Sequence, residues 1–220
     1  QLPNGDILVG TELLSVLKLT ATGNFKWQKK YSGAGCCDSG SMQLVKDGGF
    51  ALAGESTVNT ISNVVVAKCD SSGKIIFSKS YNNQILADFR STADGGYILL
   101  TFRGSPKLQI SLVKLDAFGN VQWRKISTEK ELNIPRKIRQ TTDSGYVYLN
   151  AVEWIVKLDP LGNAPDLCRN IFTSIQSTAQ NITVNQESRT PSVVPAHAVP
   201  VNENFTSVKV APIRNSICGQ

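Results

Sequence analysis

Apolar and polar residues alternate in short runs along the first three quarters of the chain, which is typical of β-strands with one buried face. Polar turns that carry glycine separate the runs, for example Asp47-Gly48-Gly49 and Asp94-Gly95-Gly96. Glycine adopts the positive φ that tight turns demand. Residues 1–165 contain no segment with the period of a long helix. The pattern therefore predicts an all-β protein.

One pattern of strands and turns occurs four times. The copies align on four lysines, with spacings of 50, 46 and 43 residues, at Lys18, Lys68, Lys114 and Lys157. A glycine follows each lysine at a constant distance, at Gly23, Gly73, Gly119 and Gly162. A period of this length with several short strands per unit is typical of propeller blades. The repeats predict a β-propeller of about four blades over residues 1–168. We expect residues 169–220 to be an extended, strand-forming C-terminal tail that docks on its own or a neighbouring propeller.

The units resemble the repeats of secreted bacterial and archaeal β-propeller proteins. The resemblance rests on turns such as Asp94-Gly95-Gly96-Tyr97, followed by Lys114-Leu115-Asp116, Gly119-Asn120 and Trp123-Arg124-Lys125. It covers roughly the first three quarters of the chain, and it implies a β-propeller that lies outside the cytoplasm, extracellular or at the cell surface. The resemblance implies no single activity, because the repeat residues build the blades.

The first copy of the pattern differs from the others. Only Gln1 and Leu2 precede its turn at Pro3-Asn4-Gly5, whereas an extended segment precedes the turn in the other copies. Unpaired N–H and C=O groups at a sheet edge accept a further strand. We therefore expect the first blade to take a strand from elsewhere.

The tail contains two candidates for that strand. The first, with Ile175, Ser177 and Ala179, is similar to Phe89–Gly95 and follows the fourth copy at about the right distance, so it would close the ring within the chain. The second is Phe205–Val210, a segment that alternates like a strand and contains the apolar residues Phe205, Val208 and Val210.

The second candidate predicts assembly between copies. We expect the proline-rich run before Phe205 to be extended and semi-rigid, so the strand suits docking on a neighbouring subunit by strand addition. Head-to-tail docking of this kind generates a filament unless the rotation closes a ring. Two alternatives stay open, namely a tail that wraps its own propeller and a tail without fixed structure.

Cysteines and glycosylation sequons add to this picture. Cys36, Cys37, Cys168 and Cys218 lie in connections or in the tail, where an oxidising compartment permits disulfides, including one from Cys218 to Cys36 or Cys37 of the next subunit. Cys69 takes a position that leucine fills in the other copies, so we expect a buried thiol. Asn181 and Asn204 begin N-glycosylation sequons, which indicate surface positions in an exported protein.

Residues that suggest a chemistry are few. The only histidine, His197, lies between Pro195 and Pro200 with no acid or serine nucleophile near it in sequence. No phosphate loop, dinucleotide motif or zinc spacing occurs. The chain is therefore predicted to be no enzyme, and neither a cofactor nor a metal is expected.

Two sets of repeated residues are interpreted as structural. One set, at the starts of the second hairpins, is expected to accept hydrogen bonds from turn amides rather than bind calcium: Asp70, Asp116 and Asp159. The other set, in the last strand of each unit, is expected to pack between blades rather than bind a sugar: Trp27, Phe77 and Trp123.

Charge and hydropathy exclude two kinds of partner. The net charge is +6, but the basic residues are scattered among apolar ones and form no dense patch, so no nucleic acid is predicted. No apolar run reaches the roughly 18 residues of a membrane helix. Hydrophobic content of 41% with 18% charged residues is ordinary for a globular protein.

The sequence leaves three classes of function, in this order. The first is a non-enzymatic structural protein, a subunit of an extracellular head-to-tail filament or surface layer held by exchange of the tail strand. The second is a secreted β-propeller that binds a glycan or a protein ligand. The third is a propeller enzyme whose site only folding assembles.

Overall fold

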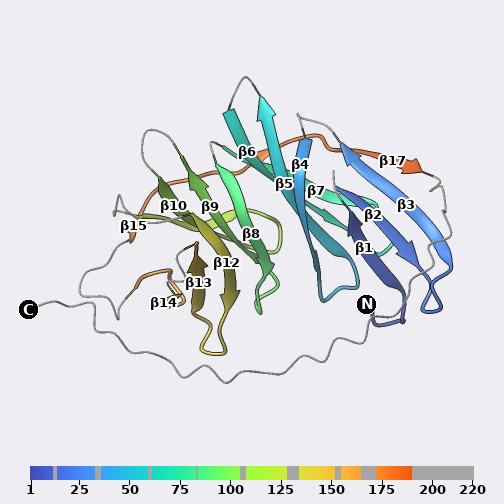
Figure 1. Cartoon of the computed structure of the whole chain (residues 1–220), viewed down its shortest axis with the longest axis horizontal. Helices are drawn as coiled ribbons and strands as arrows, with labels where there is room; N and C mark the ends of the chain where they lie inside the picture. The colour runs from blue at the N-terminus through green and yellow to red at the C-terminus, as the bar shows by residue number, and fades with distance from the viewer. Residues whose placement is uncertain are drawn as a thin grey trace, which may run out of the picture.

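Figure 1 shows the chain in a computed structural model, which describes residues 1–11, 14–32, 36–58, 61–82, 84–104, 108–127, 134–151, 155–164 and 172–189. All regular secondary structure in these ranges is β-strand, and none of it is helical. The prediction of an all-β chain is confirmed.

The strands form four antiparallel sheets that follow one another along the chain. Sheet 1 contains β1 (Ile7–Thr11), β2 (Ser15–Leu19), β3 (Phe25–Ser32) and β17 (Asn185–Arg189). Sheet 2 contains β4 (Cys36–Leu44), β5 (Phe50–Val58), β6 (Ile61–Cys69), β7 (Ile75–Tyr81) and β16 (Gln180–Asn181). Sheet 3 contains β8 (Ile85–Ser91), β9 (Tyr97–Arg103), β10 (Gln109–Leu115), β11 (Val121–Ser127) and β15 (Phe172–Ser174). Sheet 4 contains β12 (Pro135–Gln140), β13 (Tyr146–Asn150) and β14 (Ile155–Leu158).

The turn that enters the second strand of each unit has one geometry in all four copies. In sheet 2 the Val45 amide donates to the Gly49 carbonyl, and the Gly48 amide donates back to the Val45 carbonyl. The same two bonds form in the turns Leu2–Asp6, Thr92–Gly96 and Thr141–Gly145. Gly48 has a φ of 81°, and Ser144 takes the equivalent place with a φ of 64°. The N-terminal segment is therefore the first copy of this turn.

Three hydrophobic cores hold the sheets together, one between each consecutive pair. Leu8 and Val16 of sheet 1 pack against Phe50 and Leu52 of sheet 2. Corresponding clusters join sheet 2 to sheet 3 and sheet 3 to sheet 4. Within the described ranges no cluster joins sheet 4 to sheet 1, and Figure 1 shows these two sheets at the ends of the series.

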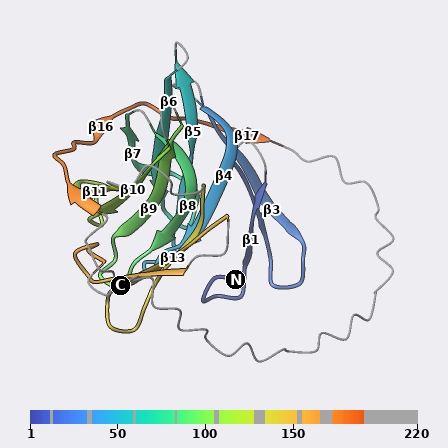
Figure 2. The same cartoon turned by 60° about the vertical axis from the view of Figure 1, so that its left-hand side comes forward.

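The described part of the tail crosses three sheets in the reverse of their chain order. β15 pairs with β11, β16 with β7 and β17 with β3, each time on the outer strand of the sheet. Figures 1 and 2 both show this segment passing across the sheets from β15 to β17. Its buried apolar residues, Phe172 and Val184, belong to the cores between sheets 3 and 4 and between sheets 1 and 2.

This path corrects the strand predicted to close the first blade. The Ile175 amide donates to the Arg124 carbonyl of β11, and Ala179 packs against the core between sheets 2 and 3. Ser177 lies in the segment between them, so these residues lie along the outer strands and not beside β1. The outer strands β3, β7 and β11 also offer an edge, and the tail pairs there.

Candidate functional site

Each sheet contacts the next through its outer strand. From β3, the Lys29 Nζ donates to the Ser72 carbonyl at 2.6 Å, and the Tyr31 hydroxyl donates to the Gly73 carbonyl at 2.7 Å. Ser72 and Gly73 belong to the hairpin between β6 and β7. The outer strand of sheet 1 therefore holds the hairpin of sheet 2.

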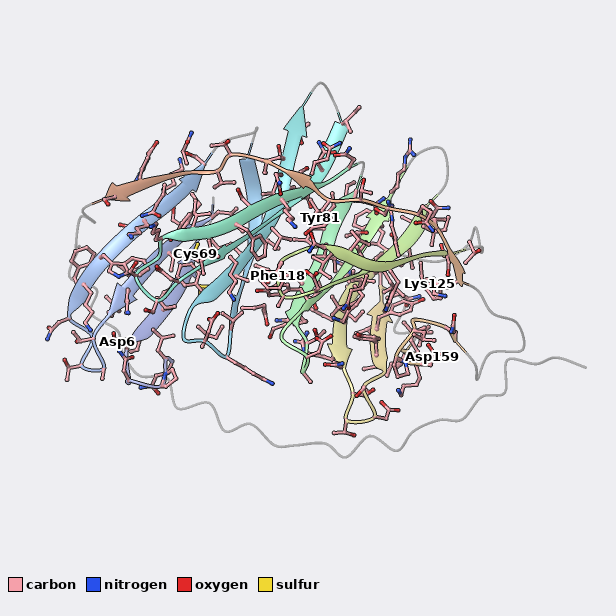
Figure 3. The ribbon with its side chains drawn as sticks, turned by 180° about the vertical axis from the view of Figure 1, so that it is seen from behind. Asp6, Cys69, Tyr81, Phe118, Lys125 and Asp159 are labelled. Carbon is pink, nitrogen blue, oxygen red and sulfur yellow. The ribbon has the colours of Figure 1, made fainter. Side chains whose placement is uncertain are left out.

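The same contact recurs further along the chain. The Tyr81 hydroxyl of β7 donates to the Gly119 carbonyl at 2.7 Å, and Lys79 donates to the Asn120 Oδ1. In sheet 3, Lys125 donates to the Oδ1 of Asn163 at 2.7 Å. Figure 3 labels Tyr81 and Lys125 on these outer strands, together with Phe118 and Asp159 of the hairpins that they contact.

The repeated aromatic residues complete these contacts. A Cβ placed on Gly73 would lie 3.1 Å from the Trp27 ring, one on Gly119 would lie 2.7 Å from the Phe77 ring, and one on Gly162 would lie 2.8 Å from the Trp123 ring. Each aromatic ring thus lies over the hairpin glycine of the following sheet. This geometry supports packing between sheets as the role of Trp27, Phe77 and Trp123.

The repeated aspartates stabilise the hairpins themselves. Asp116 Oδ1 accepts hydrogen bonds from the Phe118 and Asn120 amides, and Asp159 Oδ1 does the same for its own hairpin. Burial is the largest single influence on the pKa of Asp116 and raises it. The hydrogen bonds from Asn120 and Phe118 together outweigh burial and lower that pKa below its usual value. These carboxylates cap turns, as the sequence predicted.

The hairpin of sheet 1, Thr20–Asn24, has the same backbone hydrogen bonds as the other three hairpins. Its surroundings differ, because a Cβ on Gly23 would have nothing within 4 Å. This hairpin is the one described copy on which no preceding outer strand is packed.

The face of sheet 1 that bears this hairpin is apolar and partly exposed. We call it the leading face: Ile7, Val9, Leu17, Leu19 and Phe25. By strand register, Val9 corresponds to Leu52, Leu99 and Tyr148 in the later sheets. Val9 is 39% exposed, whereas each of those three side chains is at most 1% exposed because the preceding sheet covers it.

The opposite face of sheet 4 shows the same difference at the other end of the series. We call it the trailing face: Val147, Leu149, Ile155 and Lys157. Ile155 corresponds to Val16, Val66 and Leu112, which are fully buried, but Ile155 is 73% exposed. The Lys157 side chain is 38% exposed, compared with 5% for Lys114 at the same position in sheet 3.

Each repeated lysine pairs with an aspartate in the first turn of its own sheet. Lys114 lies 2.8 Å from Asp94, and Lys157 lies 2.8 Å from Asp143. Burial by itself raises the pKa of Asp94, but the hydrogen bonds from Lys114, Thr92 and the Gly96 amide outweigh it and lower that pKa to about 2. Lys157 holds the pKa of Asp143 well below its usual range. These ion pairs are structural, since each carboxylate already has a partner.

The remaining predicted site residues lie partly inside and partly outside the described part of the chain. Asn181 is exposed in β16, as a glycosylated side chain requires. Asn204, Phe205, Val208, Val210 and His197 lie outside the described residues. Cys69 is a buried free thiol, and burial raises its pKa to about 12, so it stays protonated. Cys36 and Cys37 lie in strand β4 and not in a connection, which corrects the prediction, and their side chains are outside the described part. Cys168 and Cys218 lie outside it entirely.

The described residues contain neither a group of metal ligands nor a membrane-spanning helix. Among the described residues no group of three or more histidine, cysteine, aspartate or glutamate side chains is placed to hold a metal ion. In the same residues no helix has the length and apolar character to cross a membrane. No protein-family model matches this sequence, and no curated protein is significantly similar to it.

The contacts between sheets have a signal in the sequence beyond the repeated aromatic residues. Aromatic, lysine and tyrosine alternate as Trp27, Lys29 and Tyr31, and the spacing recurs as Phe77, Lys79 and Tyr81. The leading and trailing faces had no such signal.

Proposed function

We propose that this chain is a structural β-propeller-type protein that lies outside the cytoplasm and assembles head to tail, each copy giving a tail strand to the next. The observation that carries the proposal is the edge of β1. Among the described strands β1 pairs only with β2, whereas sheets 2, 3 and 4 each place a further strand in that position: β4, β8 and β12. An edge of this kind accepts a strand.

The propeller assignment is supported by the order in which the sheets pack. Their innermost strands contact one another in sequence, from β1 to β4, β8 and β12. The repeated turns, the repeated cores and the outer strands that hold the next hairpin support the interpretation of each sheet as a blade.

The tail has enough length for the exchange. Residues 172–189 occupy the chain's own outer strands and end at Arg189 on β17. The fifteen residues from 190 to 204 lie between Arg189 and Phe205, and such a segment spans up to about 50 Å when extended. This length supports the pairing of Phe205–Val210 with β1 of a neighbouring copy.

The contacts of several repeated residues support a structural protein. Lys114 pairs with Asp94, the Cys69 thiol is buried, and Asp116 accepts hydrogen bonds from its own hairpin. Exposed Asn181 accommodates a glycan on the outside of such an assembly, and a tail disulfide through Cys218 would fix the joint covalently.

Electron microscopy of the full chain and of a chain that ends at Arg189 tests the proposal. The full chain is expected to form fibres or sheets, and the shortened chain to give separate particles with the fold intact, because it keeps β15, β16 and β17. A Val208→Pro variant should also disperse the fibres, since proline removes a donor from the paired strand.

A Val201→Pro variant is the control, because it places proline next to Pro200 and outside the exchanged strand. It should assemble like the unmodified chain. Fibres that persist in the chain ending at Arg189 would contradict the exchange of the tail, and particles of one constant mass in all samples would contradict the filament.

A further inference from the structure

The leading and trailing faces are two halves of one kind of interface. The chain forms this interface three times within itself, between sheets 1 and 2, 2 and 3, and 3 and 4. Each time, one sheet contributes the face that corresponds to the trailing face of sheet 4. The next sheet contributes the face that corresponds to the leading face of sheet 1. Only the leading face of sheet 1 and the trailing face of sheet 4 lack such a partner among the described sheets.

We infer that the trailing face of sheet 4 in one copy packs on the leading face of sheet 1 in a second copy of this chain. This inference rests on the head-to-tail order of the proposed function and names the surfaces that meet. Figure 1 places sheets 1 and 4 at opposite ends of the series, and no hydrophobic cluster of the described residues joins them, so the partner proposed for both faces is another copy.

The residues match position by position. At the internal interface of sheets 3 and 4, Leu112 and Leu100 of one face meet Tyr148 and Leu158 of the other in a single cluster. At the joint between copies, Ile155 and Leu149 take the places of Leu112 and Leu100. The leading face of sheet 1 offers Val9 and Leu19 at the places of Tyr148 and Leu158.

The hairpin of sheet 1 supports the same partner. At the three internal interfaces the hairpin of the following sheet lies against the preceding sheet, which covers Gly73, Gly119 and Gly162. The space beside Gly23 is open, and Phe25 beside it is 45% exposed. The corresponding residues Ile75 and Val121 pack in the internal cores. A second copy would cover Phe25 as the preceding sheet covers Ile75.

Single substitutions on each face test the inference by sedimentation velocity over a wide concentration range. Ile155→Asp on the trailing face and Phe25→Asp on the leading face should each give monomers. Phe118→Asp is the matched control, because Phe118 is as exposed as Ile155, 72% against 73%, but lies at the tip of the sheet 3 hairpin. It should associate like the unmodified chain.

The two monomeric variants should associate when mixed. The Ile155→Asp chain keeps a leading face and the Phe25→Asp chain keeps a trailing face, so one joint forms and the product contains two copies and no more. This complementation separates a head-to-tail joint from a symmetric one, in which a damaged surface stays damaged. Unchanged urea midpoints confirm folding, and Val9→Ser replaces Phe25→Asp if that variant does not fold.

The outcomes separate this inference from the proposed function. Association that survives Ile155→Asp but is lost in the chain ending at Arg189 overturns the inference and leaves tail exchange standing. Association in the chain ending at Arg189 that Ile155→Asp abolishes supports the face contact and overturns tail exchange. Monomers of the full chain together with association of the shortened chain would mean that residues 190–220 cover the faces, and would also overturn the inference.

Discussion

Sheets 3 and 4 have the same strand pattern but different neighbours. Leu112 in sheet 3 is fully buried because sheet 4 covers its face, whereas Ile155 at the matching position in sheet 4 is 73% exposed. The two side chains have nearly the same hydrophobicity. The comparison teaches that alternation of apolar residues shows which face of a strand is built for burial, and that the neighbouring sheet decides whether the face is buried.

The largest effect should come from truncating these two side chains. Leu112→Ala is expected to lower the free energy of unfolding by about 3 kcal/mol, because it removes buried methyl groups and leaves a cavity. Ile155→Ala should cost less than about 0.5 kcal/mol, as an exposed position does. Urea denaturation at a concentration where the chain is monomeric measures both. Equal losses would mean that Ile155 is covered within its own chain.

The hairpin glycines sharpen the comparison between the first sheet and the later ones. Gly119 and Gly23 both have positive φ, so alanine strains either turn by about 1 kcal/mol. Gly119→Ala also pushes a methyl group against the Phe77 ring, so its total loss should be about 2 kcal/mol. Gly23→Ala, with open space around it, should show the smaller loss alone. Thermal unfolding of both variants gives the difference, and equal losses would contradict the contact between sheets 2 and 3.

The ion pair of sheet 3 predicts a dependence on pH. The pKa of Asp94 is about 2 in the folded chain, below its ordinary 3.8, so its stabilisation is present above about pH 4 and is lost as the pH falls toward 2. Asp94→Asn should be less stable than the unmodified chain at pH 7 by about 1 kcal/mol, a value reduced for exposure of the carboxylate. Urea midpoints from pH 7 to pH 2 should converge. A constant difference at all pH values would rule out the charge as its source.

The smallest effect concerns the first turn of sheet 4. Ser144 has positive φ where the other sheets have glycine, so Ser144→Gly should raise stability by about 0.5 kcal/mol after the greater freedom of glycine in the unfolded chain is allowed for. The reverse change in sheet 3, Gly95→Ser, should lower it by about 1 kcal/mol. A loss of stability in Ser144→Gly would show that the serine side chain itself contributes.

Much of the local structure could be predicted from the sequence, because turn chemistry is local. Asp94, Gly95 and Gly96 require a particular turn wherever they stand, and the apolar residues after them alternate as a strand does. The four copies therefore gave the turns and the pairing within each sheet. Asp116 could be assigned to its hairpin for the same reason.

The path of the tail could not be predicted in this way. The likeness of the segment around Ile175 to Phe89–Gly95 shows that it is extended, but it does not show which strand it pairs with. Inner and outer edges of a sheet offer the same backbone groups, and the choice depends on where Phe172 and Val184 find apolar surface. The end faces were unpredictable for a related reason, since Ile155 and Leu112 look alike in sequence.

The tail pairs with one sheet at a time, on β11, then β7, then β3. A force applied beyond Arg189 would act first on β17, the strand nearest the C-terminus, and the two shorter pairings would still be closed. The chain would then lengthen in three separate steps, sheet 1 first and sheet 3 last, and the steps would withdraw tail side chains such as Val184 and Phe172 from the cores. Such a tail would let the chain extend stepwise under tension while the other strands of the four sheets stay paired.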